Sequence, residues 1–242
     1  MGTRIDVYMT EKMGIKSRSK AQELIRGGYV SCNGRQVTKT GLFVKEGDTV
    51  EISENEVLKY VSRGGLKLEG AIKEFGLDFE DAVILDIGSS TGGFTDCALQ
   101  HGAKKVIAVD VGTDIMDENL RKDPRIELHE NTDIREFAEE NYEGIDYAVC
   151  DASFISLPIA LKNLGASKQS FTLMALIKPQ FECGPKIASK YKGVITDSEI
   201  REEIVKRVIN DMEAIGFRYI NHTESPITGG DGNVEFISLF GH

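Results

Sequence analysis

A glycine-rich segment, residues 86–94, contains the most specific chemical pattern of the sequence. It reads Asp-Ile-Gly-Ser-Ser-Thr-Gly-Gly-Phe and follows an apolar run typical of a buried strand. Glycines let a backbone turn tightly and approach a ligand, and the preceding acid suits a ligand with a positively charged amino-acid end. The spacing differs from the G-x-G-x-x-G of dinucleotide folds, and no Lys-Ser/Thr pair follows as a P-loop requires. The segment predicts a cofactor site that includes Asp86, Gly88, Ser89, Gly92, Gly93 and Phe94.

Two further aspartates follow the next two predicted strands. Asp110 closes the run 105–110 and precedes Val111, and Asp133 comes after the run 125–130. The first carboxylate could accept hydrogen bonds from a ribose diol and the second from an adenine amino group. Each alone is more often a helix cap or a loop residue, but parallel α/β sheets bind ligands at the carboxyl ends of their strands. We therefore add Asp110, Val111 and Asp133 to the predicted cofactor site.

Two lysines and two acidic residues lie near the predicted strands, at or beyond a strand end. Lys67 precedes the first strand, Asp151 ends the fourth, Lys178 follows the fifth and Glu235 opens the last. Any one of them could be a surface ion pair of little energetic consequence. Together they could move a proton, because a lysine acts as a base only when its pKa is lowered, and a second ammonium nearby has that effect.

Seven apolar runs alternate with helical patterns in the second part of the chain. Such alternation predicts an α/β fold with a mainly parallel sheet covered by helices on both faces. The last two runs are joined by a loop without helical periodicity, so we expect a hairpin and an antiparallel final strand. The result is a seven-stranded Rossmann-like sheet within residues 63–242. The expected strands are Ala82–Ile87, Lys105–Asp110, Arg125–Glu130, Asp146–Asp151, Phe171–Ile177, Arg218–His222 and Val234–Phe240.

The net charge of −10 is unevenly distributed over the 242 residues. Residues 1–63 contain 11 basic and 8 acidic side chains, a net of +3, and the remainder has a net of −13. The average over the whole chain argues against a nucleic-acid partner, but the division makes the N-terminal segment a candidate for binding a polyanion. The change of composition predicts two domains, residues 1–52 and 63–242, with a linker at 53–62.

The N-terminal segment predicts a small α+β domain. The expected elements are a helix with Ile5, Tyr8 and Met9, a second helix capped by Ser17, a hairpin at Asn33-Gly34 and a final strand at Thr49–Ile52. The landmarks Arg4-Ile5-Asp6, Ser17-Arg18-Ser19-Lys20-Ala21, Leu24-Ile25-Arg26-Gly27-Gly28-Tyr29-Val30, Asn33-Gly34 and Gly47-Asp48 resemble the S4-type RNA-binding domain.

This resemblance implies that polar and basic side chains of the segment face structured RNA. Guanidinium and ammonium groups suit phosphate contacts, which position a partner without reading its sequence. The implied residues are Arg4, Lys16, Ser17, Arg18, Lys20, Arg26, Arg35 and Lys39. The alternative is that they are surface charges on a small protein-interaction domain.

The order Lys67, Asp151, Lys178, Glu235 on such a sheet resembles the tetrad of FtsJ-like ribose 2′-O-methyltransferases. With the N-terminal domain, the whole chain resembles the TlyA family of ribosomal RNA methyltransferases, also named haemolysins. The resemblance implies S-adenosyl-L-methionine as cofactor and ribosomal RNA, or a ribosomal subunit, as partner. It also implies Lys178 as base, Lys67 as the group that tunes it, Asp151 as holder of both lysines, and Glu235 as the residue that orients the ribose or a lysine. Related chains can carry a tryptophan between the domains, where this sequence has Leu58-Lys59-Tyr60-Val61.

Two other functions stay open: a membrane-active haemolysin, and a non-catalytic RNA-binding assembly factor that retains the cofactor pocket. The first has little support, because no apolar run approaches the roughly 20 residues that span a bilayer, and the N-terminus lacks a signal-peptide pattern. We therefore expect a cytoplasmic protein without a membrane partner. The four cysteines have neither metal-ligand nor disulfide spacing, so we expect reduced thiols and no metal site. The methylated nucleotide, the subunit and the oligomeric state are not written in any motif.

Overall fold

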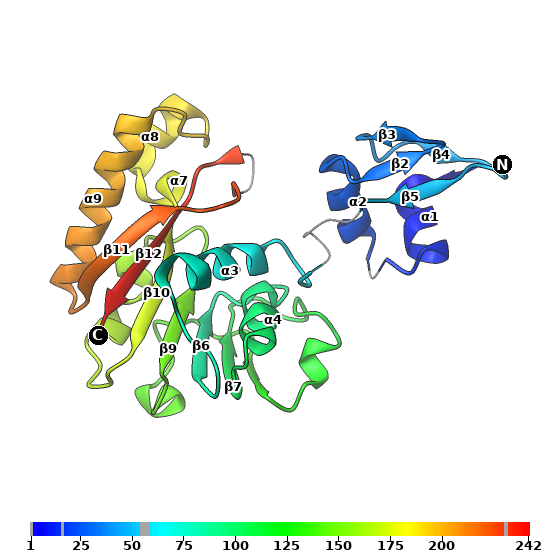
Figure 1. Cartoon of the computed structure of the whole chain (residues 1–242). Helices are drawn as coiled ribbons and strands as arrows, with labels where there is room; N and C mark the ends of the chain where they lie inside the picture. Colours follow the sequence, from blue (N-terminus) through cyan, green and yellow to red (C-terminus); the bar gives the residue numbers. More distant parts are fainter. Residues whose placement is uncertain (1, 16, 54–58, 230–231) are drawn as a thin grey trace. The chain divides into compact units, whose positions relative to one another are not determined.

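The chain divides into two compact units in the computed structural model, which describes residues 2–15, 17–53, 59–229 and 232–242 (Figure 1). Unit 1 spans Met1–Ser62 and unit 2 spans Arg63–His242. The segment predicted as a linker, residues 53–62, is grouped with unit 1, and its residues 54–58 lie outside the described part.

Unit 1 packs two helices against short strands. Its elements are β1 (Thr3–Arg4), α1 (Ile5–Lys12), α2 (Arg18–Arg26), β2 (Val30–Cys32), β3 (Arg35–Val37), β4 (Phe43–Val44) and β5 (Val50–Ile52). Strands β3, β2 and β5 form an antiparallel sheet, and β1 pairs with β4. Ser17 caps α2 by accepting a hydrogen bond from the backbone N–H of Lys20, as expected. The pairing of β1 with β4 was not predicted, because two-residue strands are too short to show alternation.

Unit 2 contains the predicted seven-stranded sheet, in the order β11-β12-β10-β9-β6-β7-β8. Neighbouring strands from β6 to β10 are parallel, and β12 is antiparallel to both β10 and β11, which confirms the expected final hairpin. The strands are β6 (Val83–Ile87), β7 (Lys105–Val109), β8 (Ile126–His129), β9 (Tyr147–Cys150), β10 (Thr172–Ile177), β11 (Arg218–Glu224) and β12 (Phe236–Gly241). Glu235, expected to open the last strand, lies just before it.

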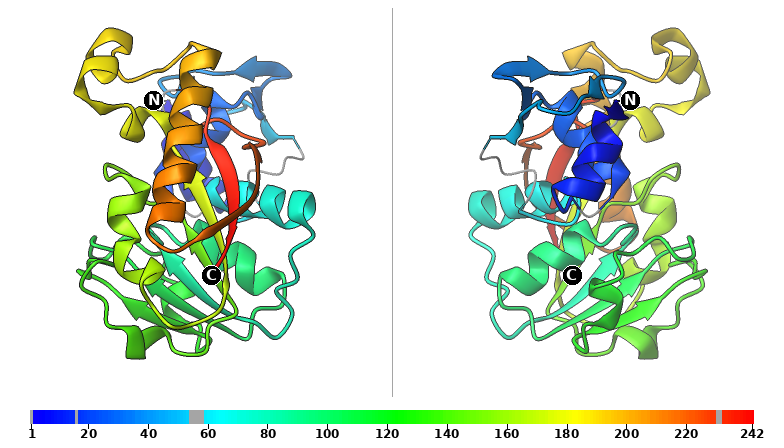
Figure 2. Two further views of the ribbon diagram at one scale, coloured as in Figure 1. Left: turned by 90° about the vertical axis from the view of Figure 1, so that its left-hand side faces the viewer. Right: turned by 90° about the vertical axis from the view of Figure 1, so that its right-hand side faces the viewer.

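Helices cover both faces of this sheet (Figure 2). They are α3 (Gly64–Phe75), α4 (Gly93–Gln100), α5 (Leu157–Ala160), α6 (Lys162–Gly165), α7 (Pro179–Glu182), α8 (Gly184–Tyr191) and α9 (Ser198–Ala214). Side chains of a strand alternate between faces. Leu85 and Ile87 therefore join the hydrophobic core that includes Val208 of α9, whereas Asp86 faces Thr95 of α4. Lys67 lies in α3, whose apolar pattern the sequence analysis did not assign to a helix.

Candidate active site

The strand order reverses beside β6, which lies between β7 and β9. Loops that leave such a point diverge to the two faces of the sheet and open a crevice at its carboxyl edge. Here the crevice is a hollow of about 830 Å³ whose lining includes Gly88, Asp110, Val111, Asp133, Asp151 and Phe154. Four of the predicted cofactor residues therefore line the same space, although they come from three different loops.

The four predicted chemical residues form one cluster of charges. Lys67 Nζ lies 2.6 Å from Glu235 Oε2 and 3.7 Å from Asp151 Oδ2. The other oxygen of the Asp151 carboxylate, Oδ1, lies 2.6 Å from Lys178 Nζ. All of these side chains except Asp151 are nearly buried. The arrangement is a lysine–carboxylate–lysine bridge extended by Glu235, built from residues up to 168 positions apart in the chain.

Lys178 has further partners that the sequence analysis missed. Its Nζ donates to the backbone oxygen of Asp151 at 3.2 Å and to Ser153 Oγ at 2.8 Å. The ring of Phe181 lies 5.8 Å from the same nitrogen, within the range of a cation–π contact. The position of Ser153, two residues after Asp151 on the loop that follows β9, was visible in the sequence, but its contact with Lys178 at the end of β10 was not.

Glu235 is held in place from a second direction. Gln180 Nε2 donates to Glu235 Oε1 at 3.2 Å, so the two carboxylate oxygens contact different side chains. Gly229 packs against the carboxylate, and a Cβ atom there would stand 2.0 Å from Oε1. The absence of a side chain at Gly229 therefore leaves room for the Glu235–Lys67 contact.

Asp86 is fully buried at the end of β6 and accepts a 2.5 Å hydrogen bond from Thr95 Oγ1. Burial, together with the negative charges of Asp151 and Asp110, raises its pKa to about 7 against the opposing hydrogen bond from Thr95. Its second oxygen, Oδ1, and the buried Ser89 Oγ have no hydrogen-bond partner among the residues that the structure describes. Two unsatisfied polar atoms beside a glycine loop are typical of a site that a polar ligand completes.

The glycine loop folds as its sequence predicts. Gly88 has a φ of +77°, and a Cβ there would lie 3.2 Å from the backbone of Ala152. Gly92 has a φ of +92°, and a Cβ there would lie 2.4 Å from Leu120. A side chain at either position meets both backbone strain and a close neighbour. Gly93 and Phe94 are buried in the first turn of α4 and do not line the hollow.

The other two predicted aspartates are already engaged with the protein. Asp110 accepts hydrogen bonds from the backbone N–H groups of Ser90 (2.8 Å) and Gly112 (2.7 Å) and so fixes the loops that follow β6 and β7. Asp133 forms a two-point ion pair with Arg135, which holds the pKa of the carboxyl below its usual range. A ligand amino group at Asp133 would share this carboxylate with Arg135.

Phe154 is the most exposed large hydrophobic side chain of those described, at 88%. Its backbone has a φ of +64°, an uncommon conformation for a bulky residue that marks local strain. The ring contacts that of Phe181, with 4.9 Å between centroids. Glu182, half-buried nearby, anchors the same loop by accepting hydrogen bonds from Ser156 Oγ and the backbone N–H of Leu157, both at 2.7 Å. No sequence pattern had indicated a role for these residues.

The predicted RNA-facing residues of unit 1 fall into four groups, of which the last contains only Lys20. Arg26, Arg35 and Lys39 are exposed, as is the capping Ser17. Arg4 and Arg18 are partly exposed and both bind the buried carboxylate of Asp6 (3.0 and 2.8 Å), so they also stabilise the fold. Lys16 lies outside the described residues.

Lys20 differs from the expectation. Its exposed fraction is 9%, and its Nζ donates to the backbone oxygen of Tyr60 and lies 3.5 Å from Glu23. The helix turns this position toward the segment 59–62 rather than toward solvent, so the ammonium has a structural role in the described geometry. Tyr60 belongs to the stretch in which related chains can carry a tryptophan, and its backbone oxygen connects it to α2.

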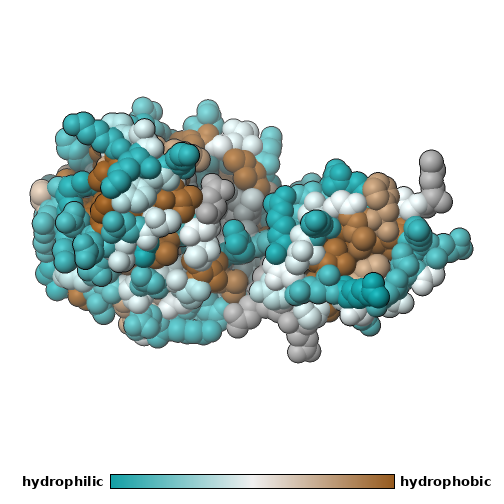
Figure 3. Space-filling model, turned by 90° about the horizontal axis from the view of Figure 1, so that it is seen from above, coloured by the Kyte–Doolittle hydropathy of each residue, from teal (hydrophilic) through white to brown (hydrophobic). Residues whose placement is uncertain are grey.

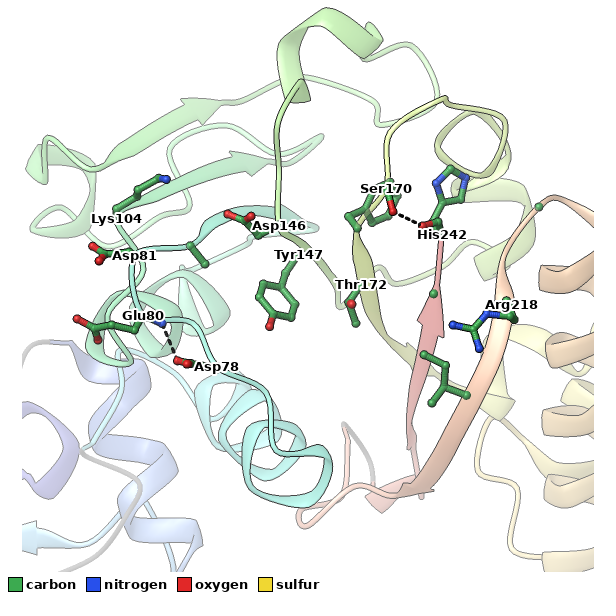
Figure 4. Close-up of a pocket in the computed structure, with 15 residues that line it drawn as sticks. Asp78, Glu80, Asp81, Lys104, Asp146, Tyr147, Ser170, Thr172, Arg218 and His242 are labelled. Atoms are coloured by element: carbon green, nitrogen blue, oxygen red, sulfur yellow. Dashed lines mark hydrogen bonds between the residues drawn. The ribbon is translucent and has the colours of Figure 1, made fainter.

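A second hollow opens at the amino-terminal edge of the sheet (Figure 4). Its lining includes the carboxylates of Asp78, Asp81 and Asp146, with Lys104 and Arg218. Asp146 accepts a hydrogen bond from the backbone N–H of Val83 and so supports the strand start. Among the described residues, no ion pair joins these acids to the two bases, in contrast to the cluster at the carboxyl edge.

The described residues also bear on the expectations about a membrane, a metal site and the cysteines. No helix among them is both long and apolar enough to cross a bilayer. They contain no group of three or more His, Cys, Asp or Glu side chains that could hold a metal ion, and all four cysteines are free thiols.

Comparison with known proteins agrees with this architecture. Residues 60–242 match the FtsJ-like methyltransferase model and residues 3–50 match the S4 domain. Hemolysin A of Brachyspira hyodysenteriae is 43% identical over 98% of this chain and 99% of its own. The 23S rRNA (cytidine-2′-O)-methyltransferase TlyA of Campylobacter jejuni is 36% identical over 98% of each. A solved structure with a hemolysin name from Streptococcus thermophilus has a TM-score of 0.77 at 36% identity, covering 99% of this chain and 88% of its own. The chain therefore belongs to the FtsJ-like methyltransferase family, carries an N-terminal S4 domain and is a relative of proteins named TlyA and hemolysin A.

Proposed function

We propose that this protein is an S-adenosylmethionine-dependent ribose 2′-O-methyltransferase that acts on ribosomal RNA, as the name of its Campylobacter relative indicates for that protein. The observation that carries the proposal is the Lys67–Asp151–Lys178 bridge with Glu235, beside the hollow at the carboxyl edge of the sheet. The expected substrate position is a cytidine, and the ribosomal subunit is the natural form of the substrate.

The residues around the hollow fit the cofactor. The unsatisfied Oδ1 of Asp86 and Oγ of Ser89 suit the amino-acid end of S-adenosylmethionine, and Asp110 has lone pairs left for a ribose diol. Val111, 69% exposed on the lining of the hollow, offers an apolar surface for a base. When bound, the cofactor supplies a methyl group on a sulfonium, which is already activated toward a nucleophile.

The protein must align the ribose hydroxyl and receive its proton. Three oxygens lie within 3.2 Å of Lys178 Nζ: Asp151 Oδ1, Asp151 O and Ser153 Oγ. A neutral amine needs a donor as well as acceptors, and of the three only the Ser153 hydroxyl can turn and donate. Ser153 can thus accompany Lys178 through both protonation states, while the Asp151 carboxylate keeps the nitrogen in position.

Lys67 and Glu235 complete the arrangement. Lys67 Nζ faces both carboxylates, so its single positive charge offsets one of their two negative charges, and Lys178 is the other cation of the cluster in the described part of the chain. Glu235 is held by Lys67 and Gln180, a geometry suited to orienting a hydroxyl rather than to taking a proton. The exposed ring of Phe154 beside Ser153 offers a flat face for the base of the nucleotide whose ribose is modified.

The test is methyl transfer from labelled S-adenosylmethionine to ribosomal subunits from cells that lack the protein, followed by mapping of 2′-O-methyl sites in both subunits. We expect Lys178→Ala to reduce transfer by about 10²- to 10⁴-fold. Its affinity for S-adenosylhomocysteine should stay at the wild-type value, because Lys178 does not contact Asp86 or Ser89.

Lys186→Ala, an exposed lysine of α8, is the matched control and should transfer at the wild-type rate. Equal transfer by wild type and Lys178→Ala would exclude the role of Lys178. Wild-type protein that modifies no ribosomal particle would contradict the proposed function itself.

A further inference from the structure

One aromatic side chain of unit 1 is displayed at the surface next to a core residue. The two residues of β4, Phe43 and Val44, are 58% and 3% exposed. Because successive residues of a strand point to opposite faces, Val44 packs into the core and Phe43 faces outward. Leu42, the residue before, is 37% exposed. In Figure 3 hydrophobic residues reach the surface of unit 1, at the right of the view, among hydrophilic ones.

The backbone around Phe43 is fixed. Phe43 pairs with Arg4 across the β1–β4 ribbon, and Ile5 N–H donates to the Leu42 oxygen at 2.8 Å. Gly2 packs closely against this strand, since a Cβ there would lie 3.2 Å from Phe43 Cβ. A side chain on a fixed backbone loses little conformational entropy when it binds a partner.

The surroundings of the ring are basic. Phe43 and Leu42 border a hollow of about 1050 Å³ whose lining also includes Arg35, Lys39 and Lys45. These three side chains are exposed, and none of them has an ion pair or a side-chain hydrogen bond within the described part of the chain.

The lining contains one carboxylate, Asp48, which faces inward to its own turn. It accepts hydrogen bonds from the backbone N–H of Lys45 (2.7 Å) and from Asn33 Nδ2 (2.8 Å), and these bonds lower its pKa. The hollow therefore combines three cations, one internally satisfied anion and an outward aromatic face.

We propose that this hollow binds an unpaired nucleotide of RNA, whose base stacks on Phe43 while Arg35, Lys39 and Lys45 meet the adjacent phosphates. A positive groove with an exposed aromatic is the usual design of single-strand recognition, because every base presents a π-face and every linkage a negative charge. The proposal rests on the proposed action on ribosomal RNA, and it adds a stacking contact to the phosphate contacts expected of the S4 domain. An apolar protein partner is the competing occupant.

The experiment measures binding of the full-length protein to ribosomal subunits and to the isolated target RNA over a range of salt concentrations. Stacking of one base accounts for about 1–3 kcal/mol, so Phe43→Ala should weaken binding by about 5- to 150-fold. Phe43→Leu keeps apolar bulk without a π-face and should lose nearly as much, whereas Phe43→Trp should keep wild-type affinity. Lys39→Ala should lower the slope of log affinity against log salt by roughly 0.7–0.9, while Phe43→Ala leaves it unchanged.

Ile220→Ala, an exposed aliphatic residue (43%) of β11, is the control and should bind as wild type does. Wild-type affinity in Phe43→Ala would overturn the proposal, and so would wild-type affinity in Phe43→Leu with a loss in Phe43→Ala, which would indicate apolar protein contact. Methyl transfer by the wild type is measured in the same samples. Transfer with no effect at Phe43 refutes only this inference, whereas no transfer to any particle refutes the proposed function.

Discussion

The pKa of Asp86 makes a quantitative prediction about cofactor binding. In the free protein this buried carboxyl is half-ionised at about pH 7, against an ordinary value of 3.8. An ammonium group placed at its unsatisfied Oδ1 would favour the ionised form, so binding should release a proton. Below pH 7 the protein must first lose that proton, so the affinity for the ligand falls as the pH falls.

The size of this change in affinity follows from the fraction of Asp86 that is ionised at each pH. With a pKa of about 7, this fraction is about one half at pH 7 and about 0.03 at pH 5.5. The affinity for S-adenosylhomocysteine should therefore rise about fifteenfold between pH 5.5 and 7, with about 0.9 proton released per ligand at pH 6. Titration calorimetry in buffers of different ionisation enthalpy measures both quantities. In the ligand-free protein the same shift lowers the free energy of unfolding as the pH rises from about 4 toward 7.

Two variants separate Asp86 from other titrating groups. Asp86→Asn cannot ionise, so its weaker binding should be independent of pH over this range. Thr95→Val removes the 2.5 Å hydrogen bond that stabilises the carboxylate, so the midpoint should move to higher pH. A flat affinity and no proton release in the wild type between pH 5.5 and 7 would refute the reasoning.

Three other predictions concern Gly229 and Glu182 in unit 2 and Asp6 in unit 1. Gly229→Ala should displace the Glu235 carboxylate from its present position and reduce methyl transfer roughly 10²-fold. The affinity for S-adenosylhomocysteine, measured by calorimetry, should stay unchanged, and normal transfer would show that this position of the carboxylate is dispensable. Glu182→Ala should cost about 1–3 kcal/mol of unfolding free energy in denaturant titrations, because the buried Leu157 N–H loses its acceptor, and Glu182→Gln should cost less. For Asp6, burial raises the pKa, but hydrogen bonds from Arg18, Gln22 and Arg4 outweigh it and hold the pKa below the usual range. The stability that Asp6 contributes should be present at neutral pH and lost in acid, and thermal melts of Asp6→Asn should show a weaker loss between pH 5 and 2.

Much of the fold followed from local patterns. Five strands of unit 2, β6, β7, β9, β10 and β12, were predictable because buried strands are continuous apolar runs. The final hairpin was predictable because the loop before the last strand has no helical periodicity. The glycine loop was predictable because positive φ angles and close backbone contacts at Gly88 and Gly92 restrict the residue type. The ribbon of β1 and β4 was not, since two residues carry no period.

The sequence by itself determined the residue types of the candidate site and their order along the strands. It could name Lys67, Asp151, Lys178 and Glu235, because their order around the predicted strands resembles the tetrad of FtsJ-like methyltransferases and the carboxyl ends of parallel strands meet at one edge. Only the tertiary structure decided which atoms touch. Packing between segments distant in sequence decides four features: the Lys178–Ser153 bond, the Gly229 contact with Glu235, the outward ring of Phe43 and the inward turn of Lys20. Local periodicity says which face of an element a residue occupies, but the neighbours across that face are fixed by how the elements pack.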